Sequence, residues 1–171
     1  MVGKNIKVIV KTAVFAAIIC VCTMLIPVPL PGGGYANLGD AIVIAAGFFC
    51  GPVYGALAAA IGSALADVLL GSALYAPATF LIKGAMALTV ALVCRSKKIT
   101  NKAVLIIFAS LLSEIEMVVG YFVYEVIIYD FSIALMDIAG NAVQGICGVV
   151  FSAVIVNLLN SAKSIRKILK I

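Results

Sequence analysis

Long apolar runs dominate this chain, and short polar or glycine- and proline-rich stretches separate them. Six apolar segments can be drawn, at about residues 7–27, 40–50, 53–70, 76–94, 103–128 and 132–160. A straight helix needs about 20 residues to cross the hydrocarbon core of a bilayer. The second segment is too short to cross alone, so we expect a short helix that its neighbours shield. The pattern predicts an all-α integral membrane protein, a compact bundle of six transmembrane helices.

The amino-acid composition also belongs in a bilayer. Hydrophobic residues make up 65% of the 171 residues and charged residues 11%, whereas soluble domains have roughly 45–50% and 25%. A sizeable soluble domain does not fit, so we expect residues 1–171 to form a single membrane domain. The basic and apolar N-terminus has no A-x-A cleavage site and is followed by more apolar segments. We therefore interpret it as the first spanning helix and not as a signal peptide.

Basic residues gather at three places along the chain and predict its orientation. They lie near the N-terminus, between the fourth and fifth segments, and after the sixth: Lys4, Lys7, Lys11; Arg95, Lys97, Lys98, Lys102; Lys163, Arg166, Lys167, Lys170. An even number of crossings puts all three groups on one side, which the positive-inside rule makes cytoplasmic. We expect both termini in the cytoplasm of a cell with a bacterial plasma membrane. Basic residues dispersed at helix ends anchor to lipid, so we expect no nucleic-acid partner.

The residue types exclude several kinds of chemistry. The chain has no histidine, which removes histidine-based catalytic triads and histidine-ligated zinc or haem. Its five cysteines lie within or at the ends of apolar segments, and we interpret them as small buried hydrophobes. Cys20 and Cys22 project about 200° apart on a helix and make a poor metal pair. We expect no metal and no cofactor.

Three charged residues lie in or beside the apolar segments of the first half of the chain. These are Asp40, Asp67 and Lys83. A charge in lipid is costly, so each is expected to be paired or functional. Asp67 and Lys83 lie at similar depth, and either they form a structural ion pair or Lys83 faces a substrate. Asp40 opens the second segment, where we interpret it as a helix cap.

The fifth segment carries polar residues on one face. Steps of seven and eleven residues place Glu114, Tyr121 and Glu125 on the same side of a helix. Glu116 points almost the opposite way. The two glutamates at 114 and 116 cannot both face one cavity, so we expect one of them to contact a neighbouring helix or a partner.

The sixth segment carries Asp137, Asn141 and Gln144 on one face. Amide and carboxyl groups at successive depths suit a small polar ring that needs both donors and acceptors. They can equally bond another helix. The outer loop at 26–39 has three prolines in its first half, followed by a run of three glycines at 32–34. It is either a plain connector or a hinged lid over an outward-facing pocket, and Tyr35 and Asn37 in it are either ligand contacts or ordinary interfacial residues.

Two stretches resemble a known family. The run YANLGDAIVIAAGFFCGPVYGALAAAIGSALADVLLG at 35–71, followed by YAPATFLIKG at 75–84, resembles the substrate-binding S component of energy-coupling factor (ECF) transporters. The chain is most similar to the branch for riboflavin-type, hydroxymethylpyrimidine or pyridoxine uptake. The resemblance covers nearly the whole chain.

The resemblance implies a function, partners and a site. An S component captures a B-vitamin or precursor from outside under its first loop. It then docks on a transmembrane T subunit that is coupled to two ATPase subunits, and it hydrolyses nothing itself. The small-xxx-small docking motif of the family corresponds to Ala13 and Ala17. The substrate-binding positions of the family point to Asn37, Lys83, Glu114, Tyr121, Asn141 and Gln144. The stacking tryptophans and the histidine of thiamine-specific relatives have no counterpart here, which weakens a thiamine assignment.

The sequence is compatible with two other kinds of function. The intramembrane carboxylates permit a stand-alone ion-coupled carrier, although no inverted repeat is evident. A membrane enzyme that uses Glu114 or Glu116 lacks a nucleophile–base pair. We therefore expect a transport subunit and no enzyme.

Overall fold

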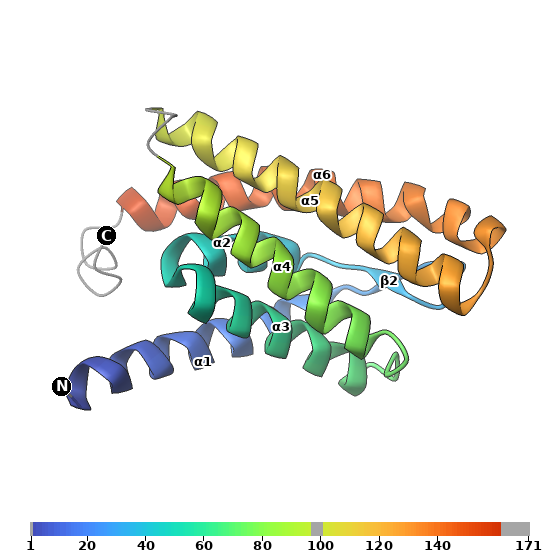
Figure 1. Cartoon of the computed structure of the whole chain (residues 1–171), viewed down its shortest axis with the longest axis horizontal. Coiled ribbons are helices and arrows are strands. Elements are labelled where there is room, and N and C mark those ends of the chain that lie inside the picture. The colour runs from blue at the N-terminus through green and yellow to red at the C-terminus, as the bar shows by residue number, and fades with distance from the viewer. Residues whose placement is uncertain (1, 97–100, 162–171) are drawn as a thin grey trace.

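The computed structural model describes residues 2–96 and 101–161 and consists of helices with one small hairpin (Figure 1). The elements are α1 (Val2–Leu25), β1 (Val28–Pro29), β2 (Tyr35–Ala36), α2 (Asp40–Cys50), α3 (Pro52–Leu69), α4 (Ala76–Arg95), α5 (Lys102–Ile128) and α6 (Phe131–Ser161). Six of the basic residues used to predict orientation, Lys97, Lys98, Lys163, Arg166, Lys167 and Lys170, lie outside the described residues.

The predicted all-α membrane bundle is confirmed. Five helices in the described part are long and apolar enough to cross a bilayer, and the sixth, α2, has 11 residues. The described residues therefore contain six helices, of which five are candidates to span the membrane, and the count of six transmembrane helices stays a prediction. Large apolar side chains face outward all around the bundle. Leu81 and Ile127, for example, are 70% and 75% exposed, which suits contact with acyl chains and not with water.

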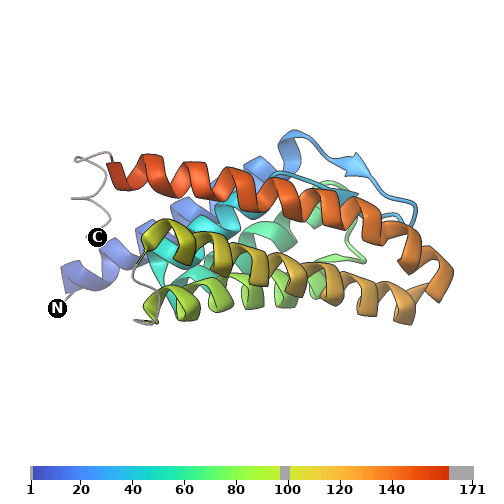
Figure 2. The same cartoon turned by 90° about the horizontal axis from the view of Figure 1, so that it is seen from above.

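The helices surround α2, which lies at the centre of one half of the molecule. Helix α3 packs between α1 and α4, α4 packs on α5, and α5 packs on α6, while α2 contacts α1, α3, α4 and α6. The start of α1, the end of α4, the start of α5 and the end of α6 all lie at the same end of the molecule (Figures 1 and 2). This placement agrees with the prediction that the basic residues gather on one side of the membrane. We call this end of the molecule the basic end.

Glycines allow two of these helix pairs to approach closely. A Cβ atom added at Gly62 on α3 would collide with the backbone of Ala16 on α1, and one at Gly47 on α2 would collide with the backbone of Ala87 on α4. Small residues at helix interfaces increase van der Waals contact, which is the main attraction between helices in lipid. The result is a tightly packed inner half around α2.

An apolar core fills the half of the bundle near the basic end. Ile19, Ile44, Met86, Val90 and Ile106 are among its buried members, each at most 2% exposed. Since α2 has only 11 residues, it is about 16 Å long and covers about half the thickness of the hydrocarbon core. It begins in the middle of the bundle, and the chain that precedes it occupies the other half.

The end of α2 is closed by a cation from α1. Lys11 donates a hydrogen bond from Nζ to the carbonyl oxygen of Phe49 at 2.5 Å. The last carbonyls of a helix have no partner within it, so a basic side chain there satisfies one of them. Gly51 then adopts φ +81° and turns the chain directly into α3, a conformation that glycine reaches without strain.

Candidate functional site

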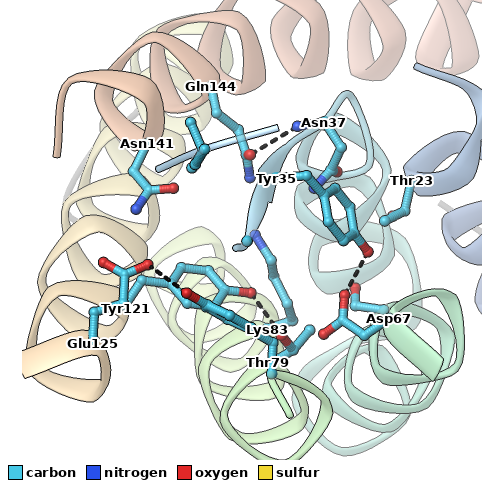
Figure 3. A pocket seen from close by; sticks show the side chains of 14 residues that line it. Thr23, Tyr35, Asn37, Asp67, Thr79, Lys83, Tyr121, Glu125, Asn141 and Gln144 are labelled. Carbon is cyan, nitrogen blue, oxygen red and sulfur yellow. Dashed lines mark hydrogen bonds between the residues drawn. The ribbon is translucent and has the colours of Figure 1, made fainter. Parts of the chain in front are cut away.

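A polar cavity lies in the half of the bundle that α2 does not reach. It has a volume of about 20 Å³, and we call it the chamber. Residues from α1, the hairpin and its flanks, α3, α4, α5 and α6 line it: Thr23, Leu30, Gly34, Tyr35, Asn37, Ser63, Asp67, Tyr75, Thr79, Lys83, Tyr121, Glu125, Asn141 and Gln144 (Figure 3). The structure thus brings together five of the six predicted binding residues: Asn37, Lys83, Tyr121, Asn141 and Gln144.

The β1–β2 hairpin forms the roof of the chamber. Its strands pair antiparallel, with Val28 opposite Ala36 and Pro29 opposite Tyr35. The tip is a tight turn in which Leu30 N–H donates to Gly34 O at 2.9 Å. Gly33 at the tip has φ +83°, so this turn requires glycine. The loop predicted as a connector or a lid is therefore an ordered hairpin folded over the cavity.

Three donor groups make four of the hydrogen bonds that hold the roof to the helices beneath it. The Gly32 N–H donates to both carboxyl oxygens of Asp137 on α6, at 3.1 and 3.0 Å. The Tyr75 hydroxyl, at the start of α4, donates to the carbonyl oxygen of Gly32 at 2.9 Å. Nearer to α2, the Asn37 N–H donates to Oε1 of Gln144 at 2.8 Å. These bonds account for the closed position of the hairpin.

Tyr35 joins the roof to α3. Its hydroxyl donates to Oδ1 of Asp67 at 2.5 Å, and Asp67 is only 4% exposed. Burial raises the pKa of Tyr35 well above its ordinary value, and the hydrogen bond to Asp67 raises it further. Both effects disfavour the charged phenolate. Tyr35 therefore remains a hydrogen-bond donor throughout the physiological pH range.

Lys83 on α4 pairs with Asp40 on α2, which corrects the interpretation of Asp40 as a helix cap and removes one of the two alternatives for Lys83. The two side chains form a buried ion pair between Nζ and Oδ1, and Oδ2 of Asp40 accepts a hydrogen bond from Nε2 of Gln144 at 2.5 Å. Asp40 is thus not a helix cap, and no side chain caps α2 at Gly39. Lys83 is not the ion-pair partner of Asp67 either. Equal depth in the membrane does not determine which residues form an ion pair, because the rotation of α4 about its axis turns Lys83 toward α2.

The polar groups deepest in the chamber come from α4 and α5. Thr79 Oγ1 and the Tyr121 hydroxyl lie 2.9 Å apart in a hydrogen bond. The ammonium of Lys83 lies 5.4 Å from the centre of the Tyr121 ring, within the range of a cation–π contact. Glu125, one turn further along α5, accepts a hydrogen bond at Oε1 from the Tyr75 hydroxyl at 3.4 Å.

Glu114 is the predicted binding residue that does not line the chamber. Its side chain is buried beneath Asp40, against Gly145 and Gly148 of α6. A Cβ at Gly148 would meet both the Glu114 carboxyl and the Asp40 Cβ, so the two acids are neighbours. Glu116 faces α4 instead, where it accepts a hydrogen bond from Thr89 at 2.8 Å. The prediction that the two glutamates point in different directions is confirmed.

Nine of the 14 chamber residues were not among the predicted binding residues. The sequence signal differs among four of them that make polar contacts in the chamber, Tyr35, Tyr75, Thr79 and Glu125. Glu125 shares a helical face with Tyr121, so spacing alone could have selected it. For Tyr35 the sequence permits either a ligand contact or an interfacial residue. Tyr75 and Thr79 lie in the YAPATFLIKG stretch that carries the family resemblance, but no helical periodicity selects them as chamber residues. Among the residues that the structure describes, no three Cys, Asp or Glu side chains are grouped to hold a metal ion.

The chain matches the sequence model of the family described as ECF-type riboflavin transporter, S component, over residues 3–161. The chain belongs to this family. A protein of Pyrococcus woesei described as "Uncharacterized protein in gap 3'region" is 34% identical to this S component over 133 residues, which cover 77% of this chain and 87% of the relative. S components are substrate-binding subunits of transporters, so this membrane protein is a transport subunit and not an enzyme.

A second surface of this S component is an apolar groove between α1 and α3, on the outside of the bundle. It has a volume of about 500 Å³, and we call it the α1–α3 groove. Ala13, Ala17, Leu57 and Ile61 are among the residues that line it. Leu57 and Ile61 are 43% and 50% exposed, and the alanines project only methyl groups. The groove is therefore a smooth surface that another helix can approach closely.

Proposed function

We propose that this S component captures a B-vitamin or vitamin precursor in the chamber, namely a pyridoxine- or hydroxymethylpyrimidine-like heterocycle, with riboflavin as the larger alternative. The observation that carries the proposal is the chamber itself. Donors and acceptors from the roof and from five long helices, α1 and α3 to α6, converge on one buried space, as in sites that fix the orientation of a small polar ring. The asparagine, glutamine and tyrosine side chains supply the mixed donors and acceptors that such a ring needs.

The closed chamber has to open before it can take up such a ligand. Its volume of about 20 Å³ has room for a single water molecule. The roof is held to the bundle mainly by the hydrogen bonds of Gly32, Tyr35 and Asn37. Such a bond contributes about 0.5–1.5 kcal/mol when its acceptor is neutral and about 1.5–3 kcal/mol when its acceptor is a charged carboxylate. In the proposed cycle the hairpin swings outward to admit the ligand and closes over it.

The chamber opens toward the outside in this proposal. The roof lies at the end of the bundle opposite to the basic end (Figures 1 and 2). Positively charged helix ends favour the cytoplasmic side, which places both termini in the cytoplasm and the roof at the outer face of the cell membrane. The ligand is then captured from outside, as uptake requires.

Delivery of the ligand to the cytoplasm needs partners, and the α1–α3 groove is the proposed docking surface for the T subunit. Ala13, Ala16 and Ala17 all line this groove, and the backbone of Ala16 also lies close to Gly62 of α3. The T subunit in turn connects the S component to two ATPase subunits. The groove lies on the outside of the bundle, so docking and ligand binding use different surfaces.

Calorimetric titration of the purified protein in detergent tests the proposal. Pyridoxine, hydroxymethylpyrimidine and riboflavin are titrated separately, and one of them is expected to bind at a single site. A ligand retained through purification and identified by mass spectrometry would give independent support. The absence of binding by every vitamin-sized heterocycle would contradict the proposal.

A further inference from the structure

The described part of the chain buries five carboxyl groups in or beside the chamber but only one basic side chain. The acids Asp40, Asp67, Glu114, Glu125 and Asp137 are each at most 4% exposed, and the single buried cation is Lys83, at 2%. The charge of Lys83 is already matched by Asp40 in an ion pair. The remaining chamber lining is therefore acidic, with no free positive charge to balance it.

Three of these acids have buried oxygen atoms without a hydrogen-bond partner among the described residues. Both oxygens of Glu114 are unpaired beneath the chamber, whereas Asp67 and Glu125 each present one unpaired oxygen in the chamber lining. Oδ2 of Asp67 and Oε2 of Glu125 are buried and accept no hydrogen bond within the described residues. Both side chains line the chamber. They lie on opposite sides of it, with Lys83 and Tyr121 between them (Figure 3). Buried acceptors without donors are rare and costly in folded proteins, so each needs an explanation.

The other oxygen of Asp67 and of Glu125 is used by the closure of the chamber. Oδ1 of Asp67 accepts from Tyr35 of the roof, and Oε1 of Glu125 accepts from Tyr75. The Tyr75 hydroxyl has one proton, which it shares between Oε1 of Glu125 at 3.4 Å and the carbonyl oxygen of Gly32 at the roof tip at 2.9 Å. Each carboxyl group thus has one oxygen toward the closing contacts and one oxygen without a protein donor.

We propose that the ligand of this S component is a neutral or cationic heterocycle with hydrogen-bond donors at two opposite edges, and that it carries no anionic group. One edge donates to Oδ2 of Asp67 and the other to Oε2 of Glu125. Ring N–H, amino and hydroxymethyl groups supply such donors. A carboxylate or phosphate would instead meet two acceptor groups, while Lys83 is held by Asp40. This inference rests on the proposed function, since it specifies the ligand of the same chamber.

A matched pair of ligands tests the charge preference directly. Pyridoxamine and 4-pyridoxic acid have the same ring and differ in a single substituent, an aminomethyl group against a carboxylate. Calorimetry is expected to show pyridoxamine binding at least about tenfold more tightly, the scale of one charge-assisted hydrogen bond gained or lost. If the flavin ring binds better than the pyridine ring, riboflavin and flavin mononucleotide form the corresponding pair.

Variants of the two acids identify the groups responsible. Glu125→Gln and Asp67→Asn keep the side-chain shape and remove the negative charge, so each is expected to reduce the preference by several-fold. Glu116→Gln is the matched control, because Glu116 lies outside the chamber against Thr89, and it should leave the preference unchanged. Elution volume and melting temperature in detergent report whether each variant is folded. The wild-type pair decides the question alone if a variant is not.

The outcomes separate this inference from the proposed function. Equal binding of both members of the pair, or tighter binding of the carboxylate, would overturn the inference and leave the proposed function standing. An unchanged preference in both folded acid variants would also overturn it. Failure of every heterocycle to bind would remove both.

Discussion

The chamber and the α1–α3 groove are opposite in almost every physical respect. The chamber is closed, polar and about 20 Å³ in volume, whereas the groove is open to lipid, apolar and about 500 Å³. Hydrogen bonds and an ion pair determine the shape of the chamber, and small side chains determine that of the groove. Selection of a small polar ligand needs directed donors and acceptors, while docking of a helix in lipid needs close packing. Substitutions in the groove should therefore impair transport without changing ligand binding, and substitutions in the chamber should change ligand binding itself.

The largest effect is expected from a large side chain introduced into the α1–α3 groove. Ala13→Trp or Ala17→Trp should abolish uptake by cells that carry the T and ATPase subunits, while the calorimetric affinity for the ligand stays unchanged. The physical reason is that an indole ring prevents the backbone approach that small residues allow. The matched control is Val14→Trp, since Val14 is 50% exposed but does not line the groove. Uptake that persists in both alanine variants would mean that α1 is not the docking surface.

The next largest effect is expected on the stability of the fold around the Lys83–Asp40 ion pair. Lys83→Met should lower the free energy of unfolding by about 3–5 kcal/mol, because it leaves the carboxylate of Asp40 buried without its cation. The double variant Lys83→Met with Asp40→Asn should recover much of the loss. Thermal unfolding in detergent measures both. A single variant as stable as the wild type would show that the ion pair contributes little to the fold.

A smaller effect is expected on ligand affinity. Asn141→Ala should weaken binding by about 1–3 kcal/mol, since it leaves a polar group of the bound ligand unpaired in a buried site. Gln144→Leu should do the same, but Gln144 also bonds Asp40 and Asn37, so its effect includes altered packing. Calorimetry gives the affinities, with Thr89→Ala on the far side of α4 as the control. Unchanged affinity in both chamber variants would move the site elsewhere.

The smallest effect is expected at the tip of the roof. Asp137→Asn removes the charge that assists the hydrogen bonds from the Gly32 N–H, at a cost of about 1 kcal/mol. The bound ligand should therefore dissociate about fivefold faster, with little change in the melting temperature. Asp130→Asn is the control, because Asp130 bonds the start of α6 and not the roof. Stopped-flow release rates would show whether the roof limits dissociation.

The sequence predicted the elements of this fold closely, because its apolar runs are long and are interrupted by glycine and proline. The predicted segment at 76–94, for example, corresponds to α4 at Ala76–Arg95. Helical spacing also selected Asn141 and Gln144 on α6 and Tyr121 on α5. Such spacing gives the face that a residue occupies on its own helix, but not the helix that this face meets.

The incorrect predictions have this same physical origin. Lys83 and Asp67 lie at similar depth, yet the ion-pair partner of Lys83 is Asp40, since side-chain direction depends on how α2 and α4 are rotated. Glu114 shares a face with Tyr121, but it is two turns further toward the basic end, beneath the chamber. Tyr75 contributes through its reach across to Gly32 and Glu125, which no local pattern contains.

The short length of α2 has a consequence for how the size of the ligand site can change in such a protein. A sixth full-length helix would occupy the middle of the bundle from one face of the bilayer to the other. Because α2 starts only at Asp40, the space above it is vacated and the hairpin folds inward to close it. Each additional helical turn at this start would advance about 5.4 Å into that space. The residue at which α2 begins thus determines how large a ligand the chamber can hold, independently of which side chains surround it.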